Sequence, residues 1–335
     1  MDDFLVVTLA RHAMATRFEL ALWGADPYFL RAAGEEALAE IERLEAQLSL
    51  YRPDSELSGI NARAGQEAVP VEPRLFALLK EAAALSAATG GAFDPTIAPL
   101  LRCWGLAGGN PGGVGSGGRV PAPAELEEAL ARVGMPYVSL VEADRTVRFT
   151  RAGMLLDLGA IGKGYAIDAA IALLREAGVD AALLHGGTST VYGLGAPPGE
   201  AGWRVAIRHP LQPERRLGFV CLRDAALSVS AGHGKSFTRQ GRTYGHVLDP
   251  RSGRPVEGCL LAAVAGPAAA ATDALSTALL VLGEPGLSLV AAWGPGYRGL
   301  VAWADRLAKD KEEKTNGKNE DGAVNIVILQ DTAAG

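Results

Sequence analysis

The chain has 335 residues, of which 48% are hydrophobic and 21% charged, a balance typical of a globular protein with a sizeable core. Its formal net charge is −6 and no basic stripe runs along it, which argues against a nucleic-acid partner. Three widely spaced cysteines without a C-x-x-C pair argue against a disulfide framework and a structural zinc site.

The first half of the chain predicts a strand pair followed by helices. Asp26 can cap the first helix and Pro27 suits its first turn, while Gly90-Gly91 would end the second helix. In chain order we expect paired strands at Phe4–Leu9 and Arg17–Leu22, helices at Asp26–Leu50 and Pro73–Thr89, a mobile glycine-rich loop at Ala107–Gly118 and a short helix at Pro123–Val133.

Strands dominate the second half, with few helices between them. This pattern favours an α+β fold with a mainly antiparallel sheet and packed helices. We expect strands at Tyr137–Val141, Thr146–Phe149, Gly153–Leu156, Ala181–His185, Trp203–Arg208, Leu217–Leu222, Arg242–Val247 and Leu260–Ala265, and helices at Gly162–Ala177 and Thr272–Leu282. A charged run, Lys309–Gly322, is interpreted as a solvated loop inserted into a hairpin of Leu300–Ala304 and Asn325–Leu329.

The N-terminal stretch does not have the features of a signal peptide. It begins with two acidic residues, Asp2 and Asp3, and its apolar run is short. Elsewhere no stretch approaches the roughly 18 apolar residues of a membrane span. As the sequence stands, we therefore expect a cytoplasmic protein without a membrane span.

The stretch DLGAIGKGYAID, Asp157–Asp168, lies between an apolar segment and a predicted helix. Its glycines allow a close backbone approach, and Lys163 adds a positive charge at the start of the helix, where anions are favoured. It is not a Walker A motif, because Asp157 and Gly164 stand where that motif needs Gly and Ser or Thr. Two interpretations remain open: a phosphate-binding turn, or a plain strand-to-helix turn with a surface lysine.

The stretch TYGHVLDPRSGRPV places one histidine, His246, before a turn that is restricted by Pro250. A rigid loop of this kind suits a general base, because an unperturbed imidazole titrates near neutral pH. The alternative is a hydrogen-bonded structural histidine, with Asp249 pairing to Arg251 or Arg254 across the turn.

The stretch ATDALSTALLVLG places Asp273 and Thr277 one helical turn apart, so their oxygens share a face. A carboxylate beside a hydroxyl or backbone carbonyl suits a hard cation such as Mg²⁺. The alternative is helix capping by Thr272 or Asp273. Three aromatic residues among turn residues, Tyr51, Phe93 and Trp104, could stack on a planar ring or cover the edge of the core.

Taken together, the motifs follow one another in an order that resembles the ApbE family, the FAD:protein FMN transferases. The resemblance runs from about Met14 to the final strand and is most specific around Asp157, His246 and Asp273. Its stretches are MATRFEL, LYRPDSELSGIN, GGAFDPTIAPLLRCWG, DLGAIGKGYAID, HGG, GWRVAIRHP, GHVLDPRSGRP and TDALSTALLVLG.

The resemblance implies a single domain over residues 1–335 with a T-fold-like α+β architecture, which binds FAD as substrate together with Mg²⁺. It implies transfer of FMN to a Thr or Ser hydroxyl of a target protein with release of AMP, and His246 as the base. The implied FAD contacts are Met14, Tyr51, Ala92, Phe93, Asp94, Asp157, Lys163 and Val247. The implied metal ligands are the Ala160 carbonyl, Asp273 and Thr277.

The target of such an enzyme carries a motif similar to D-x-x-[ST]-G-A-[ST], which this chain lacks, so we expect the target to be another protein. Family members are often exported. The chain departs from the family where Ser230-Ala231-Gly232-His233 replaces a common Thr-Ser-Gly-Asp run, and where Thr188 and Ser276 replace acidic residues. An FAD pyrophosphatase and a non-catalytic flavin-binding protein are the alternative functions. The sequence leaves the acceptor protein and the oligomeric state open.

Overall fold

A large antiparallel sheet forms the centre of the computed structural model, which describes residues 5–107, 118–232, 236–304 and 324–328. The sheet has eight strands in the order β1-β2-β6-β7-β10-β15-β16-β17, and every neighbouring pair is antiparallel. The α+β prediction is therefore confirmed. The strands are β1 (Leu5–Ala13), β2 (Thr16–Gly24), β6 (Ala181–Gly186), β7 (Thr190–Leu194), β10 (Ala225–Ala231), β15 (Cys259–Gly266), β16 (Arg298–Ala304) and β17 (Val324–Ile328).

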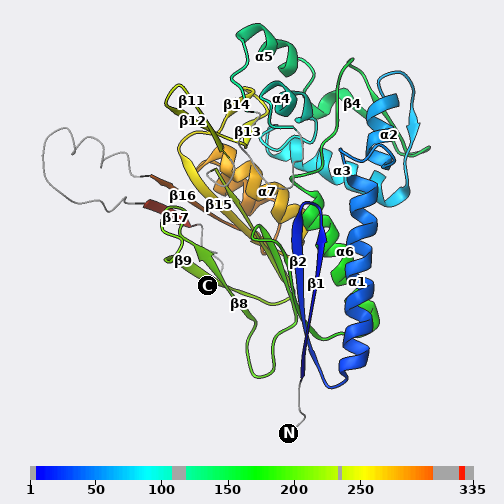
Figure 1. The fold of residues 1–335 in the computed structure, drawn as a ribbon, viewed down its shortest axis with the longest axis vertical. Coiled ribbons are helices and arrows are strands. Elements are labelled where there is room, and N and C mark those ends of the chain that lie inside the picture. Colours follow the sequence, from blue (N-terminus) through cyan, green and yellow to red (C-terminus); the bar gives the residue numbers. More distant parts are fainter. Residues whose placement is uncertain (1–4, 108–117, 233–235, 305–323, 329–335) are drawn as a thin grey trace, which may run out of the picture.

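Helices cover one face of this sheet (Figure 1). The helices are α1 (Pro27–Leu48), α2 (Glu56–Arg63), α3 (Pro73–Ala88), α4 (Ala98–Cys103), α5 (Pro123–Leu130), α6 (Gly162–Ala177), α7 (Ala269–Leu282) and α8 (Gly286–Ala292), with a 3₁₀ turn, η1 (Met135–Tyr137). Helix α6 packs between α1 and α7, and α7 lies on β10 and β15. No helix within the described ranges has the length and apolar character needed to cross a bilayer.

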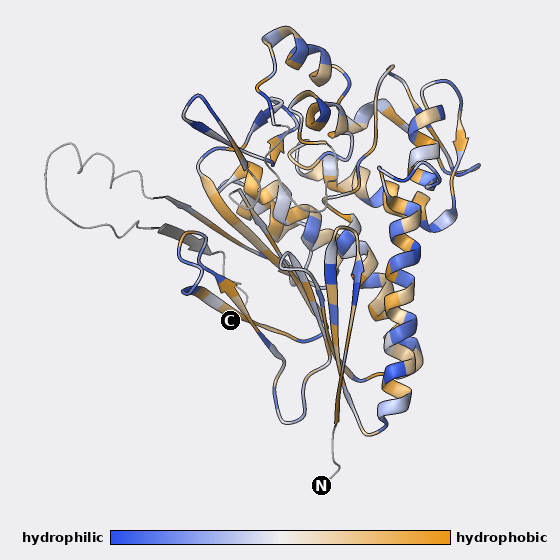
Figure 2. Ribbon diagram, in the orientation of Figure 1, coloured by the Kyte–Doolittle hydropathy of each residue, from blue (hydrophilic) through white to orange (hydrophobic). Residues whose placement is uncertain are grey.

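Helix α1 shows why this layer forms. Asp26 caps it by accepting hydrogen bonds from the amides of Tyr28 and Phe29, and Pro27 occupies its first turn, as predicted. Along its length hydrophilic and hydrophobic residues alternate (Figure 2), and the apolar ones, such as Ile41 and Leu44, are fully buried against the core.

A two-stranded ribbon covers part of the opposite face of the sheet. It consists of β8 (Trp203–Arg208) and β9 (Arg216–Leu222). Trp203 packs edge-on against Trp23 of β2, with ring centroids 4.8 Å apart, and Leu222 is buried beside it. The sheet is therefore a middle layer with a core on each side.

Short elements build an upper lobe around α4 and α5 (Figure 1). Leu100, Phe237 and Leu248 form its small core. The remaining elements are β3 (Val69–Pro70), β4 (Val138–Val141), β5 (Thr146–Phe149), β11 (Ser236–Arg239), β12 (Arg242–Gly245), β13 (Leu248–Asp249) and β14 (Arg254–Pro255). This lobe carries the segment that contains His246.

One predicted strand is wrong, one predicted hairpin is confirmed, and two predicted loops lie wholly or largely outside the described residues. The predicted strand Gly153–Leu156 does not form, because the Asn61 side chain pairs with both the amide and the carbonyl of Leu156, at 2.7 and 2.9 Å. Strands β16 and β17 pair as the predicted hairpin. Within the predicted loops, positions 108–117 and the whole of Lys309–Gly322 lie outside the described residues.

Candidate functional site

The glycine- and lysine-containing turn at the start of α6 meets the first turn of α7 around one carboxylate. The ammonium of Lys163 lies 3.5 Å from Oδ2 of Asp273, and the amide of Gly164 donates to the same oxygen at 3.2 Å. A Cβ at Gly164 would stand 2.1 Å from the carbonyl oxygen of Ala269, so only glycine permits this helix approach. Two motifs that are distant in the sequence thus form one site.

Asp273 is buried and has few partners. Its side chain is 5% exposed, and burial raises the pKa of its carboxyl above the usual range, against the opposing effects of Lys163 and the Gly164 amide. Its second oxygen accepts from the hydroxyl of Thr190 on β7 at 3.3 Å, a contact that no motif predicted. A carboxylate in these surroundings is stabilised by a further cation.

The oxygens around Asp273 suit a hard cation. The Thr277 hydroxyl, one turn along α7, donates to the backbone carbonyl of Asp273 at 3.3 Å. Ala160 lies just before Ile161, which occupies the N-cap position of α6, so its carbonyl belongs to the same turn as Lys163. Within the described part of the chain, no group of three or more His, Cys, Asp and Glu could hold a metal. A single carboxylate with hydroxyl and carbonyl oxygens is nevertheless the donor set that Mg²⁺ takes when substrate phosphates complete its shell.

Ser276, one of the departures noted in the sequence, faces the sheet. It is fully buried, and its hydroxyl lies 2.8 Å from the Ser230 hydroxyl on β10 and donates to the Asp273 carbonyl at 2.9 Å. The alternative that Thr272 or Asp273 caps the helix is wrong, because α7 begins at Ala269. His233, another departure, lies outside the described residues.

Asp157 ties a second loop to the α6 turn. Its amide donates to the Pro95 carbonyl at 2.6 Å and its carboxylate accepts from the Gly159 amide at 2.8 Å, while Lys163 donates to the Gly159 carbonyl at 3.2 Å. Burial raises the pKa of the Asp157 carboxyl, and the Gly159 amide and Lys163 oppose that rise. The loop that carries Ala92, Phe93 and Asp94 is therefore fixed beside the start of α6.

Within that loop the side chains point into the protein. Ala92 is 1% and Phe93 3% exposed, so any ligand would meet them through the backbone. The Asp94 carboxylate accepts from the amide and hydroxyl of Thr96, at 2.8 and 2.5 Å, and from the Met135 amide at 2.9 Å. Asp94 thereby orders the loop.

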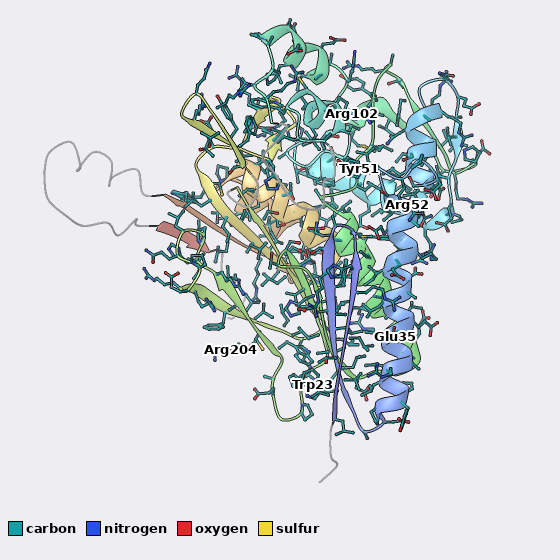
Figure 3. The ribbon with its side chains drawn as sticks, in the orientation of Figure 1. Trp23, Glu35, Tyr51, Arg52, Arg102 and Arg204 are labelled. Atoms are coloured by element: carbon teal, nitrogen blue, oxygen red, sulfur yellow. The ribbon has the colours of Figure 1, made fainter. Side chains whose placement is uncertain are left out.

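Only Tyr51 of the three loop aromatics presents its ring at the surface. It is 60% exposed, just beyond the upper end of α1 (Figure 3). Trp104 is 4% exposed and its indole nitrogen donates to the Gly253 carbonyl at 2.7 Å. The rings of Phe93 and Trp104 are thus core residues, and stacking on a planar ligand is left to Tyr51.

Met14 occupies a strained turn. Met14 and Ala15 join β1 to β2 with φ of 50° and 56°, values that usually require Gly or Asn in a two-residue hairpin turn. The Met14 amide donates to the Glu45 carboxylate of α1 at 2.7 Å, which fixes the turn. Backbone strain held in this way often marks a functional position.

His246 lies in a bend between β12 and β13 and is half-buried, whereas the sequence predicted a strand through Val247. The preceding residue, Gly245, packs so closely on the Gly232 carbonyl that a Cβ would stand 2.9 Å from it. Ser230, two residues before Gly232, has its hydroxyl 3.3 Å from that of Thr277. The His246 bend is thus anchored at the end of β10, close to the α7 site.

The turn after His246 is rigid. The Val247 carbonyl accepts from the Val256 amide at 2.9 Å, and Arg251 pairs with Asp249 at 2.9 Å, one of the two pairings considered. A cavity of about 710 Å³ opens next to this turn, lined among others by Ser86, Gly91, Asp94, Met135 and Arg251. Its volume lies in the range of ligand pockets. A second cavity of about 620 Å³, lined among others by Arg175, Asp180 and Asp224, lies at the opposite end of α6.

Comparison with known proteins places this geometry among proteins of one family. The model of the ApbE family matches residues 14–298. A Treponema pallidum protein named FAD:protein FMN transferase is 33% identical over 296 residues, which cover 84% of this chain and 79% of that protein.

Two solved structures are similar over nearly their full length. The ApbE protein of Thermotoga maritima has a TM-score of 0.81 at 27% identity, covering 96% of each chain. The apo form of the Pseudomonas stutzeri flavinyl transferase ApbE has a TM-score of 0.78 at 30% identity, covering 91% of this chain and 94% of that one. The expected ApbE architecture is therefore confirmed.

Proposed function

The chain belongs to the ApbE family, and we propose that it acts as an FAD:protein FMN transferase. The observation that carries this proposal is the pairing of Lys163 with the buried Asp273 where α6 and α7 begin, near the His246 bend. A cation and backbone amides at a helix N-terminus suit a pyrophosphate, and a carboxylate beside them can hold the metal ion that accompanies it.

In the proposed reaction a Thr or Ser hydroxyl of another protein, in a D-x-x-[ST]-G-A-[ST]-like motif, attacks the phosphorus of the FMN half of FAD. A new phosphorus–oxygen bond joins the FMN phosphorus to the acceptor oxygen, and the bond from that phosphorus to the bridging oxygen breaks. AMP leaves with the bridging oxygen. The hydroxyl proton passes to the His246 imidazole, which acts as the general base.

The residues proposed to bind FAD come from five segments of the chain. Lys163 would neutralise phosphate charge, and Tyr51 would offer its exposed ring to a planar ring of FAD. Ala92 and Phe93 would contact FAD through their backbone groups, because their side chains are buried. The full proposed set is Met14, Tyr51, Ala92, Phe93, Asp94, Asp157, Lys163 and Val247.

We further propose that the Ala160 carbonyl, Asp273 and Thr277 hold Mg²⁺. When bound, the ion would supply charge neutralisation at the pyrophosphate, on which phosphoryl transfer chiefly depends together with positioning. The chain's own contribution is orientation: Thr190 and the Gly164 amide hold the Asp273 carboxylate, and Lys163 adds a fixed positive charge beside it.

One incubation separates this function from its alternatives. The full chain is mixed with FAD, Mg²⁺ and a separate domain that carries the acceptor motif, and products are followed by in-gel flavin fluorescence and chromatography. Fluorescent acceptor with released AMP supports the transferase. Free FMN and AMP without labelling would indicate a pyrophosphatase, and intact FAD would indicate a binding protein.

A further inference from the structure

Helix α7, which carries Asp273 and Thr277, is capped by a residue of another helix. Its own N-cap position is Ala268, whose side chain cannot cap. Instead Asp168 of α6, 101 residues earlier, accepts from the Ala269 amide through Oδ1 and from the Ala270 amide through Oδ2, both at 2.8 Å. One carboxylate thus satisfies two otherwise unpaired amides of the first turn.

Gly164 makes the second contact on the same face of α6. Residues 164 and 168 are one turn apart, so both point toward the same neighbour. Gly164 brings the α6 backbone against the Ala269 carbonyl, and its amide reaches the Asp273 carboxylate at 3.2 Å. The first turn of α7 is therefore held on α6 at both ends.

The same α6 turn carries Lys163. The contacts of Asp168 and Gly164 with α7 therefore fix the position of Asp273 relative to Lys163. Asp273 lies about one helical turn beyond the capped amides and Thr277 about two. A rotation or slide of α7 on α6 would alter the 3.5 Å separation of Lys163 from Asp273 directly. Phosphoryl transfer depends on the positions of the groups around the phosphate, and a misplacement of about 1 Å can slow such a reaction strongly.

We propose that Asp168 is a positioning residue: by capping α7 from α6, it sets the place of Asp273 and Thr277 relative to Lys163. The inference rests on the proposed function. It concerns how the metal-binding face of α7 is aligned with the phosphate-binding turn of α6.

The surroundings of Asp168 support a role beyond helix stability. Burial raises the pKa of Asp168 to about 6, against the two amides, and the neighbouring Glu81 adds to the rise. Burial also raises the pKa of Tyr297 to about 12, with Glu81 and Asp168 contributing. A short polar side chain at position 268 would cap α7 without a buried carboxylate. Such a local cap would not link α7 to α6.

The test compares three variants of the full chain by titration with Mn²⁺, followed by electron paramagnetic resonance. Asp168→Asn retains the side-chain volume and one acceptor but loses the second acceptor and the charge. Asp26→Asn, the matched control, makes the same change at the cap of α1. Asp168→Asn/Ala268→Asp restores a cap to α7 from its own N-cap position, while the tie from residue 168 of α6 stays weakened.

We expect Asp168→Asn to weaken Mn²⁺ binding about 10-fold, the scale of residues that orient a metal ligand, and Asp26→Asn to leave it unchanged. The double variant should regain the melting temperature of the wild type but keep the weak Mn²⁺ binding. Recovery of both together would overturn the inference, because it would reduce Asp168 to a stabilising cap.

Asp273→Ala distinguishes this inference from the proposed function. If it abolishes Mn²⁺ binding while Asp168→Asn binds like the wild type, the metal site stands and the positioning role of Asp168 is wrong. If neither Asp273→Ala nor Asp168→Asn changes Mn²⁺ binding, the proposed metal site is wrong and the inference falls with it.

Discussion

The Lys163 ammonium and the Asp273 carboxylate form a shielded ion pair, 3.5 Å apart, with side chains that are 21% and 5% exposed. They belong to different motifs and different helices, and each charge compensates the other in a site that is shielded from solvent. Burial disfavours the Asp273 charge, and Lys163 is the strongest group that opposes this effect. The stability and the proposed chemistry of the site therefore both depend on this pair.

Replacing Lys163 by Met should raise the pKa of Asp273 further and destabilise the fold. We expect a loss of about 1–3 kcal/mol near pH 8, less than for a fully buried pair because Lys163 is partly exposed. The loss should shrink as the pH is lowered to 4, since a carboxyl with a raised pKa destabilises the fold only when ionised. Urea denaturation at both pH values measures this, and Lys163→Met/Asp273→Asn should recover part of it. An equal loss at both pH values would exclude the pairing as its cause.

Replacing His246 by Ala should leave FAD binding intact and reduce FMN transfer by about 10²–10⁴-fold, the usual contribution of a general base. FAD affinity from fluorescence quenching and single-turnover transfer separate the two effects. His209→Ala is the control, because that imidazole accepts from the amides of Leu211 and Gln212 in a surface turn and should affect stability alone. Unchanged transfer in His246→Ala would remove the base assignment.

Replacing Asp273 by Ala should abolish transfer together with its Mg²⁺ dependence, because the proposed site would lose its only carboxylate ligand. Asp224→Ala removes an exposed carboxylate paired with Arg175 at the far end of α6, and should leave transfer as in the wild type. A magnesium titration of the transfer rate measures both. An Asp273→Ala enzyme still stimulated normally by Mg²⁺ would contradict the ligand role.

Asp168 should make the stability of the chain pH-dependent. Its pKa rises from 3.8 to about 6 in the fold, chiefly because burial disfavours its charge, and the amides of Ala270 and Ala269 oppose the rise. Its favourable contribution is then fully present below about pH 4 and is lost as the pH rises through about 6. Relative to Asp168→Asn, the wild type should lose up to about 3 kcal/mol over this range. Denaturation curves of both proteins at pH 4 and pH 7.5 test this, and a constant difference would refute it.

Local sequence signals predicted most of the fold, because they act over a few residues. The Asp26 cap, the apolar face of α1 and the paired glycines after α3 identified those helices. Apolar runs identified strands such as β2, β6 and β15, but the central strands β7 and β10 and the order of the strands were not predicted. The helix at Glu56–Arg63 was missed: its residues were interpreted as a turn, although Ser55 caps it.

Long-range pairings could not be predicted in this way. The Asn61 amide takes both backbone groups of Leu156, 95 residues away, and so replaces the strand partner that the sequence pattern led us to expect. Likewise the Thr190 hydroxyl on Asp273 and the cap from Asp168 depend on how helices and strands cross. The motif residues were identified by type and order, but the groups that hold them are visible only in three dimensions.

The central claim, FMN transfer from FAD to a protein hydroxyl, is tested most directly by the intact mass of an acceptor domain incubated with this chain, FAD and Mg²⁺. We predict a mass increase equal to FMN less one water on the motif Thr or Ser, with one AMP released per labelled acceptor. An acceptor of unchanged mass, with FAD either intact or hydrolysed to free FMN, would contradict the account.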